Sequence, residues 1–288
     1  MIALTGGSGN IGRHLVRLLG AANQEIRVLA RDVDRARTVL GEEVTIVAAA
    51  SPDALTGVEK LFYIEHASSQ LATAAEVMAT AARAAGVKHI VAISSGTIDM
   101  KPPVALGHWH AALEETIMGS GCGHTFLRPG NFASNTLRWA ASIRAKSMVF
   151  VADTDSTSAP VDPYDIAAVA AVALTQPGHE GKTYTVQGPQ RMSARDQVSV
   201  IGAALGRSLQ IVGVPPQSAR EGMMRGGMAE EMADAIIELL RSRDEGVVGD
   251  VLAVTGNAPR DFGTWVKDHR RSFARSLTLA AARAAAPR

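Results

Sequence analysis

Short apolar runs alternate with amphipathic stretches along the first half of the chain. The apolar runs predict strands at residues 2–5, 26–30, 44–49, 60–64, 89–94 and 125–128. Apolar residues at helical spacing between these runs predict helices at residues 11–19, 33–40, 70–85 and 109–118. Strands separated by helices in this way form right-handed βαβ crossovers. We therefore expect the α/β class, with a doubly wound parallel sheet covered by helices on both faces.

The second half has a less regular pattern and predicts a smaller, mostly helical lobe. Asp162 and Pro163 are typical of a helix start, because Asp caps free amide groups and Pro suits the first turn. Strands are expected at 182–187 and 209–214, and helices at 162–174, 193–205, 217–241 (interrupted by two glycines) and 261–273. We expect a first domain at 1–155, a lobe at 156–275 whose strands and helices return to the sheet, and a flexible tail at 276–288.

Composition and charge narrow the class of protein. The chain has 288 residues, of which 47% are hydrophobic and 20% charged, as is typical of a globular protein with a sizeable core. A formal net charge of +1 offers no electrostatic attraction for nucleic acid or a membrane surface. The single cysteine, Cys122, excludes an internal disulfide, and no long apolar run predicts a membrane span. We expect a cytoplasmic protein without a signal peptide, either a monomer or a homodimer.

A glycine-rich segment, TGGSGNIG at residues 5–12, joins the first predicted strand to the first predicted helix. In such a loop Gly6 permits a tight turn, Gly9 lets the backbone approach a pyrophosphate, and Gly12 permits close packing of helix on strand. Amide groups at the helix start, together with the helix dipole, attract phosphates. This context predicts a dinucleotide site, and the alternative is a glycine-rich turn without a ligand.

The end of the second predicted strand, RVLARDVDRAR at residues 27–37, bears on which dinucleotide is bound. Asp32 falls at the distance expected of an acid that binds the ribose of NAD. It is also placed to cap the helix that begins at Val33, which would occupy its carboxylate. Arg31 and Arg35 then favour a 2′-phosphate, the alternative being that both are solvated surface residues. We predict NADP as the coenzyme, with NAD less favoured.

Several segments together resemble the NmrA-like branch of the atypical short-chain dehydrogenases/reductases. They read TGGSGNIG (5–12), ISSGTID (93–99), TFLRPGNFASN (125–135), APVDPYDIAAVAAVAL (159–174), GKTYTVQGP (181–189) and DFGTWVKDHRRSF (261–273). The resemblance covers about the first 273 residues, and its motifs are specific in combination rather than singly. It implies an NAD(P)-binding Rossmann domain with a C-terminal substrate lobe, in agreement with the predicted elements.

The resemblance also implies where the coenzyme would lie. Its pyrophosphate would contact the glycine loop, formed by Thr5, Gly6, Ser8, Gly9, Asn10, Ile11 and Gly12. Arg31 would meet the NADP phosphate, and Ile64 and His66 would line the adenosine side. The nicotinamide would be bordered by Ser94, Ser95, Pro129, Gly130, Asn131 and Phe132.

The chain lacks the Tyr-x-x-x-Lys pair that supplies the proton in the wider superfamily. Its three tyrosines, Tyr63, Tyr164 and Tyr184, have no Lys four residues later. His110 and Glu114 instead stand at that spacing on a predicted helix. His110 is a candidate general acid oriented by Glu114. Alternatively it only binds nicotinamide ribose or substrate, or the two residues form a pair that stabilises the helix face.

The remaining reactive side chains predict neither a metal site nor thiol chemistry. The other histidines are separated in sequence, and His108 and His110 point to different sides of a helix. Cys122 precedes a predicted strand and is interpreted as a small turn or core residue. Substrate selection is expected from the irregular segments, with residues 131–139 and four methionines as candidates: Met223, Met224, Met228 and Met232. For the methionines, the preferred interpretation is that they are core residues.

These features predict an NADPH-dependent oxidoreductase that reduces a small aromatic, quinone-like or carbonyl compound. The substrate would lie beside Ser95, His110 and Asn131, and a quinone needs little acid help because its product is a comparatively acidic phenol. Two alternatives stay open: a catalytically silent NAD(P)-binding redox sensor that acts through a protein partner, and a non-redox lyase or isomerase. The serines and the RPGNF loop favour catalysis, whereas the missing acid is compatible with the sensor.

Overall fold

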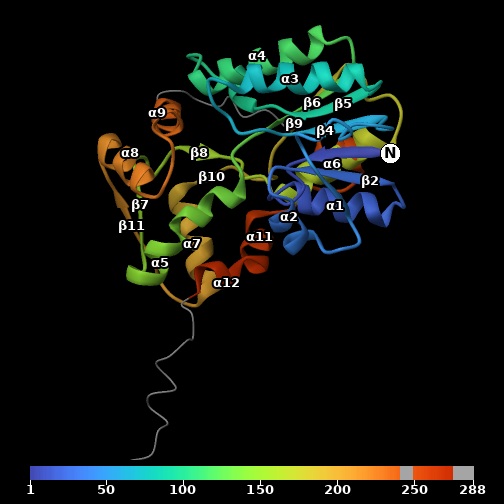
Figure 1. Ribbon diagram of the computed structural model, residues 1–288. Helices are drawn as coiled ribbons and strands as arrows, with labels where there is room; N and C mark the ends of the chain where they lie inside the picture. The colour runs from blue at the N-terminus through green and yellow to red at the C-terminus, as the bar shows by residue number, and fades with distance from the viewer. Residues whose placement is uncertain (241–248, 275–288) are drawn as a thin grey trace, which may run out of the picture.

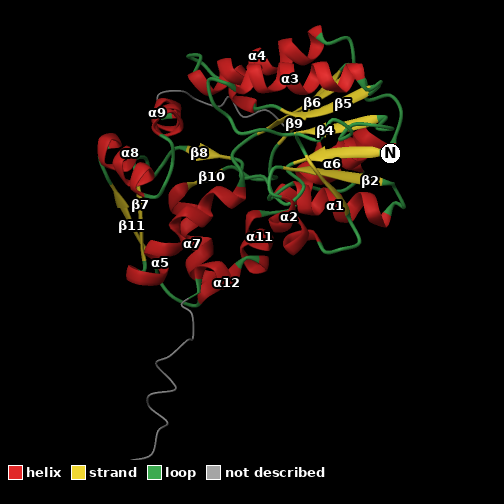
Figure 2. Cartoon of the chain, viewed as in Figure 1, coloured by secondary structure: helices red, strands yellow, loops and turns green. Residues whose placement is uncertain are grey.

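The structure, a computed structural model, describes residues 1–240 and 249–274 and is built on a seven-stranded sheet (Figures 1 and 2). The strand order is β3-β2-β1-β4-β5-β6-β9, and every pairing is parallel. The strands are β1 (Ile2–Thr5), β2 (Ile26–Ala30), β3 (Thr45–Ala48), β4 (Lys60–Tyr63), β5 (His89–Ile93), β6 (Gly123–Pro129) and β9 (Lys182–Val186). The predicted doubly wound α/β fold is confirmed.

Helices cover both faces of this sheet. One face carries α1 (Gly12–Ala21), α6 (Pro163–Thr175) and α10 (Val251–Thr255), and the other carries α3 (Leu71–Ala84) and α4 (Ala105–Gly119). A further helix, α2 (Val33–Leu40), lies beside β3. In β4, Phe62 packs into the core under α1 and α6, whereas Leu61 and Tyr63 pack under α3 and α4. A strand buried on both faces needs no polar side, which explains the continuous apolar runs in the sequence.

The rest of the described chain forms a mostly helical lobe beside the sheet (Figure 2). Its helices are η2 (Ala133–Trp139), α5 (Ala140–Lys146), α7 (Ala194–Leu205), α8 (Pro216–Arg225), α9 (Glu230–Leu239), α11 (Phe262–Asp268) and α12 (Arg270–Phe273). Two small sheets complete it, β7 (Met148–Val151) with β11 (Gln210–Gly213) and β8 (Thr157–Ser158) with β10 (Met192–Ser193). Aromatic side chains from its last helices, Phe262, Trp265 and Phe273, fill the lobe's own core.

Several predicted boundaries are confirmed and others are wrong. Asp162 caps α6, since its Oδ1 accepts a hydrogen bond from the Tyr164 amide at 2.9 Å. The single helix expected at 261–273 is two helices, because the chain leaves helical geometry at His269, whose ring stacks on Trp265 at 4.3 Å between centroids. The sequence pattern missed β7, β8, β10, η1 (Gly96–Asp99), η2, α5 and α10, which are all short.

Two expectations concern chain segments and membranes. The tail expected at 276–288 lies outside the described residues. Within residues 1–240 and 249–274, no helix combines the length and the apolar character needed to cross a bilayer.

Cys122 is buried, and its Sγ donates to the Val87 carbonyl at 3.4 Å, which confirms its interpretation as a small core residue.

Candidate functional site

The glycine loop lies at the carboxyl end of β1, where the strand order turns back from β2 and β3 to β4. Gly6 has a φ of +62°, a left-handed conformation that favours glycine, and a Cβ there would lie 2.6 Å from Ile64 Cγ2. At Gly12 a Cβ would lie 2.2 Å from the Gly6 carbonyl oxygen. Side chains at these positions would therefore separate α1 from the strand and block the loop's approach to β4. Open parallel sheets bind ligands at such a reversal of strand order.

The start of α1 is free of competing side-chain acceptors. Its N-cap, Ile11, makes no side-chain capping bond, and the first turn holds no acidic residue. Gly6, Gly9 and Asn10 of the loop are exposed. The loop therefore presents backbone and the positive end of a helix dipole to solvent, an arrangement that suits an anionic group.

Further contacts tie this loop to neighbouring segments. The Thr5 hydroxyl donates to the Ile64 carbonyl at 2.8 Å and accepts from the Ile64 amide at 2.8 Å, which joins the ends of β1 and β4. Asn10 Nδ2 donates to Ser134 Oγ at 3.4 Å, which brings η2 of the lobe against the loop. The predicted pyrophosphate and adenosine segments are thus adjacent in space.

The end of β2 holds both candidate ribose-binding side chains. Asp32 caps α2, with its Oδ1 accepting from the Arg35 amide at 2.9 Å, as predicted. The Arg31 side chain is 74% exposed, and its Nη1 lies 3.9 Å from Glu65 Oε1. His66 is exposed, and its amide donates to that same carboxylate oxygen at 2.8 Å. Arg31 therefore has room to meet a ligand, whereas one oxygen of Asp32 is engaged by the helix.

Glu114 does not orient His110, so that prediction is wrong. The buried Glu114 carboxylate accepts from Arg128 Nε at 2.9 Å, from Arg128 Nη2 at 2.8 Å and from Ser94 Oγ at 2.5 Å. Arg128 also pairs with Asp99, at 3.1 Å from Nη1 to Oδ2. The hydrogen bond to Glu114 raises the pKa of Arg128. A bidentate guanidinium captures a carboxylate more strongly than an imidazole one helical turn away, and α4 is thereby fastened to the ends of β5 and β6.

His110 is buried on α4 and has a different partner. Its Nδ1 lies 2.8 Å from the Leu106 carbonyl, and a carbonyl only accepts, so Nδ1 carries the proton. Burial lowers the pKa of His110, against the smaller opposing effects of that hydrogen bond and of the Glu114 charge. At neutral pH the ring is therefore uncharged, and its Nε2 is a hydrogen-bond acceptor.

The other predicted nicotinamide residues meet at the carboxyl ends of β5 and β6. Ser95 is buried and caps η1, accepting from the Thr97 amide at 3.2 Å. The Gly130 amide donates to the Val186 carbonyl at 3.0 Å, and Asn131 Nδ2 donates to Ser158 Oγ at 3.2 Å. Pro129 is buried at the end of β6, and Phe132 forms an isolated bridge with Val161. The structure thus places these residues on the same edge of the sheet as the glycine loop.

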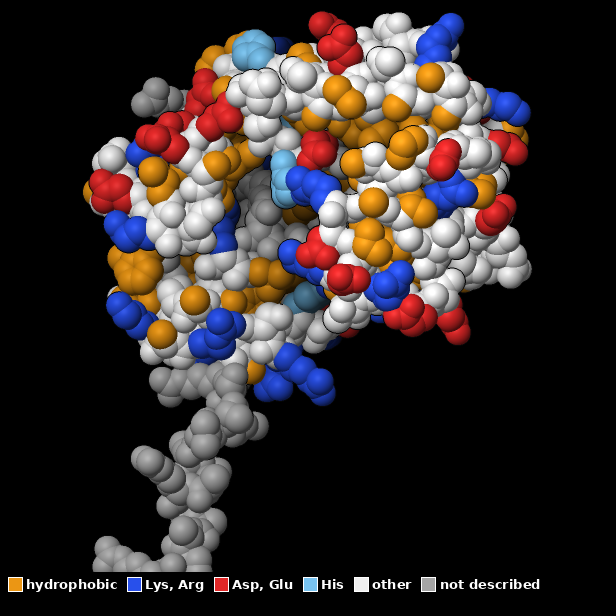
Figure 3. Space-filling model, viewed as in Figure 1, with side chains coloured by type: hydrophobic (Ala, Val, Ile, Leu, Met, Phe, Trp, Pro, Cys, Tyr) orange, Lys and Arg blue, Asp and Glu red, His pale blue; other side chains and the backbone are white. Residues whose placement is uncertain are grey.

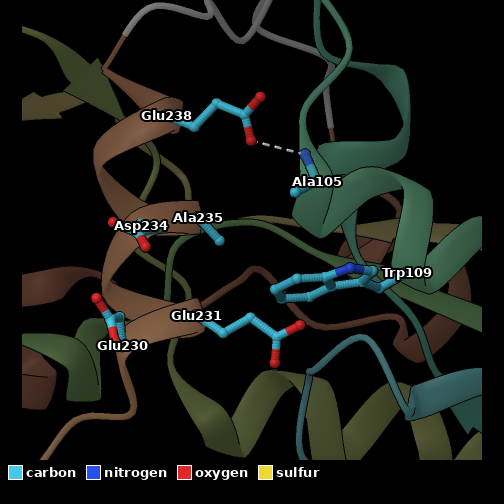
Figure 4. A pocket seen from close by; sticks show the side chains of 7 residues that line it. All are labelled: Ala105, Trp109, Glu230, Glu231, Asp234, Ala235 and Glu238. Atoms are coloured by element: carbon cyan, nitrogen blue, oxygen red, sulfur yellow. Dashed lines mark hydrogen bonds between the residues drawn. The ribbon is translucent and has the colours of Figure 1, made fainter.

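A hollow of about 720 Å³ separates α4 from α9 of the lobe (Figure 4). Trp109 lies on one wall, and the opposite wall carries the carboxylates of Glu230, Glu231, Asp234 and Glu238. Glu238 Oε2 accepts from the Ala105 amide at 2.8 Å, and Glu231 Oε1 accepts from the Ser69 amide at 2.9 Å. The methionines expected to form a pocket do not line this hollow. Glu231 and Glu238 escaped the sequence analysis because their partners are backbone amides far away in the chain.

In the part of the chain that the structure covers, no group of three His, Cys, Asp or Glu side chains is arranged to hold a metal ion. Figure 3 shows that the surface of the molecule is hollowed between the lobe and the sheet domain.

A parallel sheet with a glycine loop at its strand reversal, followed directly by an uncapped helix, defines a Rossmann-type dinucleotide-binding protein. The sequence profile of the NAD(P)H-binding family matches residues 6–177. The chain therefore belongs to the NAD(P)H-binding family, and the predicted nicotinamide dinucleotide coenzyme is confirmed.

Comparisons with known proteins extend beyond this domain. The chain is 35% identical over 283 residues to an NAD(P)H azoreductase of Xenophilus azovorans, covering 95% of this chain and 99% of that protein. It is also 35% identical over 286 residues to a (4-alkanoyl-5-oxo-2,5-dihydrofuran-3-yl)methyl phosphate reductase of Streptomyces griseus, with coverage of 95% and 99%. A solved NADPH-dependent quinone oxidoreductase of Escherichia coli has the same fold, with a TM-score of 0.79, 24% identity and coverage of 93% and 99%.

These relatives confirm the predicted enzyme class, an NAD(P)H-dependent oxidoreductase, and the membership of the Rossmann superfamily. The NmrA-like branch, the individual coenzyme contacts and the domain boundaries at 155 and 275 remain predictions. The lobe's core begins earlier in the chain than residue 155, because Ala133, Trp139, Ile143 and Val149 pack into it.

Proposed function

We propose that this protein is an NADPH-dependent reductase of a small aromatic, quinone-like or carbonyl compound. The observation that carries the proposal is the loop from Gly6 to Gly12, where added side chains would strike Ile64 and the loop's own backbone. This narrow cradle at an uncapped helix start fits the pyrophosphate of a dinucleotide. When bound, the coenzyme supplies a hydride from its nicotinamide ring.

NADP is preferred to NAD because of how the end of β2 is arranged. An oxygen of Asp32 is engaged by the Arg35 amide, whereas the guanidinium of Arg31 is exposed and held only at 3.9 Å from Glu65. A 2′-phosphate offers that guanidinium a charge-assisted partner, which the ribose hydroxyl of NAD does not. We expect Arg31→Ala to weaken NADP binding about tenfold and to leave NAD binding unchanged. Isothermal titration calorimetry measures both, and Arg37→Ala on the following helix, α2, is the control.

His110 acts as a binding residue rather than as a general acid. Its Nδ1 proton is committed to the Leu106 carbonyl, and burial keeps the ring uncharged at neutral pH. Nε2 therefore accepts a hydrogen bond and has no proton to donate. Substrates whose reduced form is a stable anion suit such a site, because the product takes its proton from solvent. A quinone, which yields a phenolate, meets this requirement better than a simple ketone, which yields a strongly basic alkoxide.

Glu114, Ser94 and Arg128 fix the position of α4, the helix that carries His110. Their hydrogen bonds join α4 to the ends of β5 and β6 across a buried contact. Ser95 and Asn131 lie at those strand ends and are proposed to border the nicotinamide and the substrate. The substrates named for the two relatives differ, an azo compound for one and a furanone phosphate for the other, so the proposed substrate class rests on the site itself.

Stopped-flow oxidation of NADPH against a panel of naphthoquinones, aldehydes and ketones tests the proposed function. We expect quinones to be reduced fastest, with a rate constant for reduction that stays level between pH 6.5 and 8.5. A rate that falls as pH rises through this range would restore His110 as an acid. Tight binding of NADP without reduction of any compound would instead support the redox sensor.

A further inference from the structure

The helix η2 presents three distinct faces, because side chains three residues apart align in a 3₁₀-helix. Ala133, Thr136 and Trp139 form the buried face. Ser134 lies on a second face and meets Asn10 of the glycine loop. The third face carries Asn135 and Arg138, which are both exposed. This third face is therefore turned away both from the lobe's core and from the loop predicted to hold the pyrophosphate.

Arg138 is an unusual arginine in this molecule. It makes no hydrogen bond and no ion pair with any described residue, while Arg128, Arg220 and Arg260 are each paired with carboxylates. The surrounding protein lowers the pKa of Arg138 by burial, with no charged neighbour contributing, yet the side chain reaches solvent. Arg138 therefore presents to solvent a guanidinium that no described residue pairs with.

The polar neighbours of Arg138 connect it to the predicted substrate site. Asn135 Nδ2 donates to Asn131 Oδ1 at 2.9 Å, and Asn131 Nδ2 donates to Ser158 Oγ at 3.2 Å. Arg138 follows Asn135 by one turn of η2, a rise of about 6 Å. A substrate lying beside Asn131 can therefore extend along this face toward the guanidinium.

We propose that Arg138 is a specificity-determining residue that binds an oxyanion group of the substrate, a phosphate, sulfonate or carboxylate. A guanidinium offers five donors in a planar fork that matches such a group, and an unpaired one has all five free for a ligand. The proposal rests on the reductase function proposed above. The phosphates of the coenzyme are the other source of oxyanions, and the position of Ser134 assigns them to a different face of η2.

Calorimetric binding of two matched probes to the protein saturated with NADP⁺ tests this proposal. Naphthalene-2-sulfonate carries the oxyanion, and naphthalene-2-sulfonamide is its neutral counterpart. We expect the sulfonate to bind about tenfold more tightly to the wild type, and this preference to vanish in Arg138→Gln. Arg138→Lys should retain part of the preference. The control, Arg271→Gln, changes an exposed arginine of the same lobe and should retain all of it.

Equal loss of both probes in Arg138→Gln would overturn the proposal, as would an unchanged preference for the sulfonate. Weaker NADP⁺ binding by Arg138→Gln, measured in the same instrument, would assign Arg138 to the coenzyme and overturn it too. The proposed function fails by a different result, namely no oxidation of NADPH by the uncharged quinone menadione in the wild type. Turnover of menadione by the wild type supports the proposed function, and loss of the sulfonate preference in Arg138→Gln supports the role of Arg138.

Discussion

The sheet domain and the hairpin of α8 and α9 are held in place by different forces. In the sheet, β5 is buried along its whole length, and apolar side chains pack against helices on both faces. By contrast, α8 has no buried residue, and α9 buries only Ala233 and Ala235. The hairpin is held instead by Arg220 with Glu230 and Asp234, and by carboxylates of α9 that accept from amides of the sheet domain.

This difference predicts that the sheet domain is rigid and that the hairpin opens locally. Apolar burial is strong and non-directional, so it holds the glycine loop in one geometry. Exposed ion pairs contribute little free energy, and elements with few apolar contacts open locally at low cost. The hairpin borders the hollow beside α4, so the wall of that hollow is expected to be the region that opens first.

The largest expected effect comes from a polar contact placed inside the apolar region. Glu114→Gln would remove the buried charge partner of the Arg128 guanidinium and leave it only the exposed Asp99, at a cost of about 3 to 5 kcal/mol in the free energy of unfolding. Urea denaturation measures this loss. Glu115→Gln, an exposed neighbour on α4, is the control and should change stability by less than about 0.5 kcal/mol. Equal effects of the two variants would contradict the assigned role.

A single methyl group in the glycine loop tests the rigidity of the sheet domain. Gly12→Ala would place a Cβ 2.2 Å from the Gly6 carbonyl and 2.5 Å from Gly7 Cα, against backbone that cannot rotate away. We expect a loss of about 3 kcal/mol in stability and of at least about 100-fold in NADP affinity. Gly20→Ala is the matched control on the same helix, where a Cβ meets nothing within 4 Å. It should stabilise the protein slightly, by up to about 1 kcal/mol.

The stability of the folded protein is expected to depend on pH through Asp165, at the contact between α6 and the lobe. Burial raises the pKa of Asp165 to about 6, even though its Oδ2 accepts from the Arg260 amide at 2.8 Å. The folded protein therefore retains a proton that the unfolded chain releases, and this residue's contribution to stability falls as pH rises from 4 to 6. In Asp165→Asn the loss is absent, so the variant should gain about 2 kcal/mol over the wild type between pH 4 and pH 7.

Denaturation curves of both proteins at each pH give that difference. A gap between wild type and Asp165→Asn that stays constant from pH 4 to pH 7 would show that Asp165 is ionised as readily in the folded protein as in the unfolded chain. Asp34→Asn, an exposed aspartate on α2, controls for the loss of one charge.

The smallest effect is expected in the hairpin. Glu238→Ala would remove the acceptor for the Ala105 amide at the start of α4, at a cost of about 1 kcal/mol. Hydrogen exchange followed by mass spectrometry should show faster exchange in α9 and at the start of α4, with exchange in β5 unchanged. Glu76→Gln, exposed on α3, serves as the control. Faster exchange throughout the sheet would mean that the hairpin is part of the same cooperative unit.

The sequence by itself determined the order of strands and helices in the first half, the capping aspartates at Asp32 and Asp162, and the position of the glycine loop. These features depend on periodicity, sterics and hydrogen bonds between residues close together in the chain. Only the tertiary structure decided that Glu114 joins Arg128 and Ser94 instead of His110, and that Glu238 reaches Ala105. The short strands β7, β8 and β10 also required it. Such pairings depend on which distant segments the fold brings within hydrogen-bond reach, and the local sequence pattern contains no information about distances between such segments.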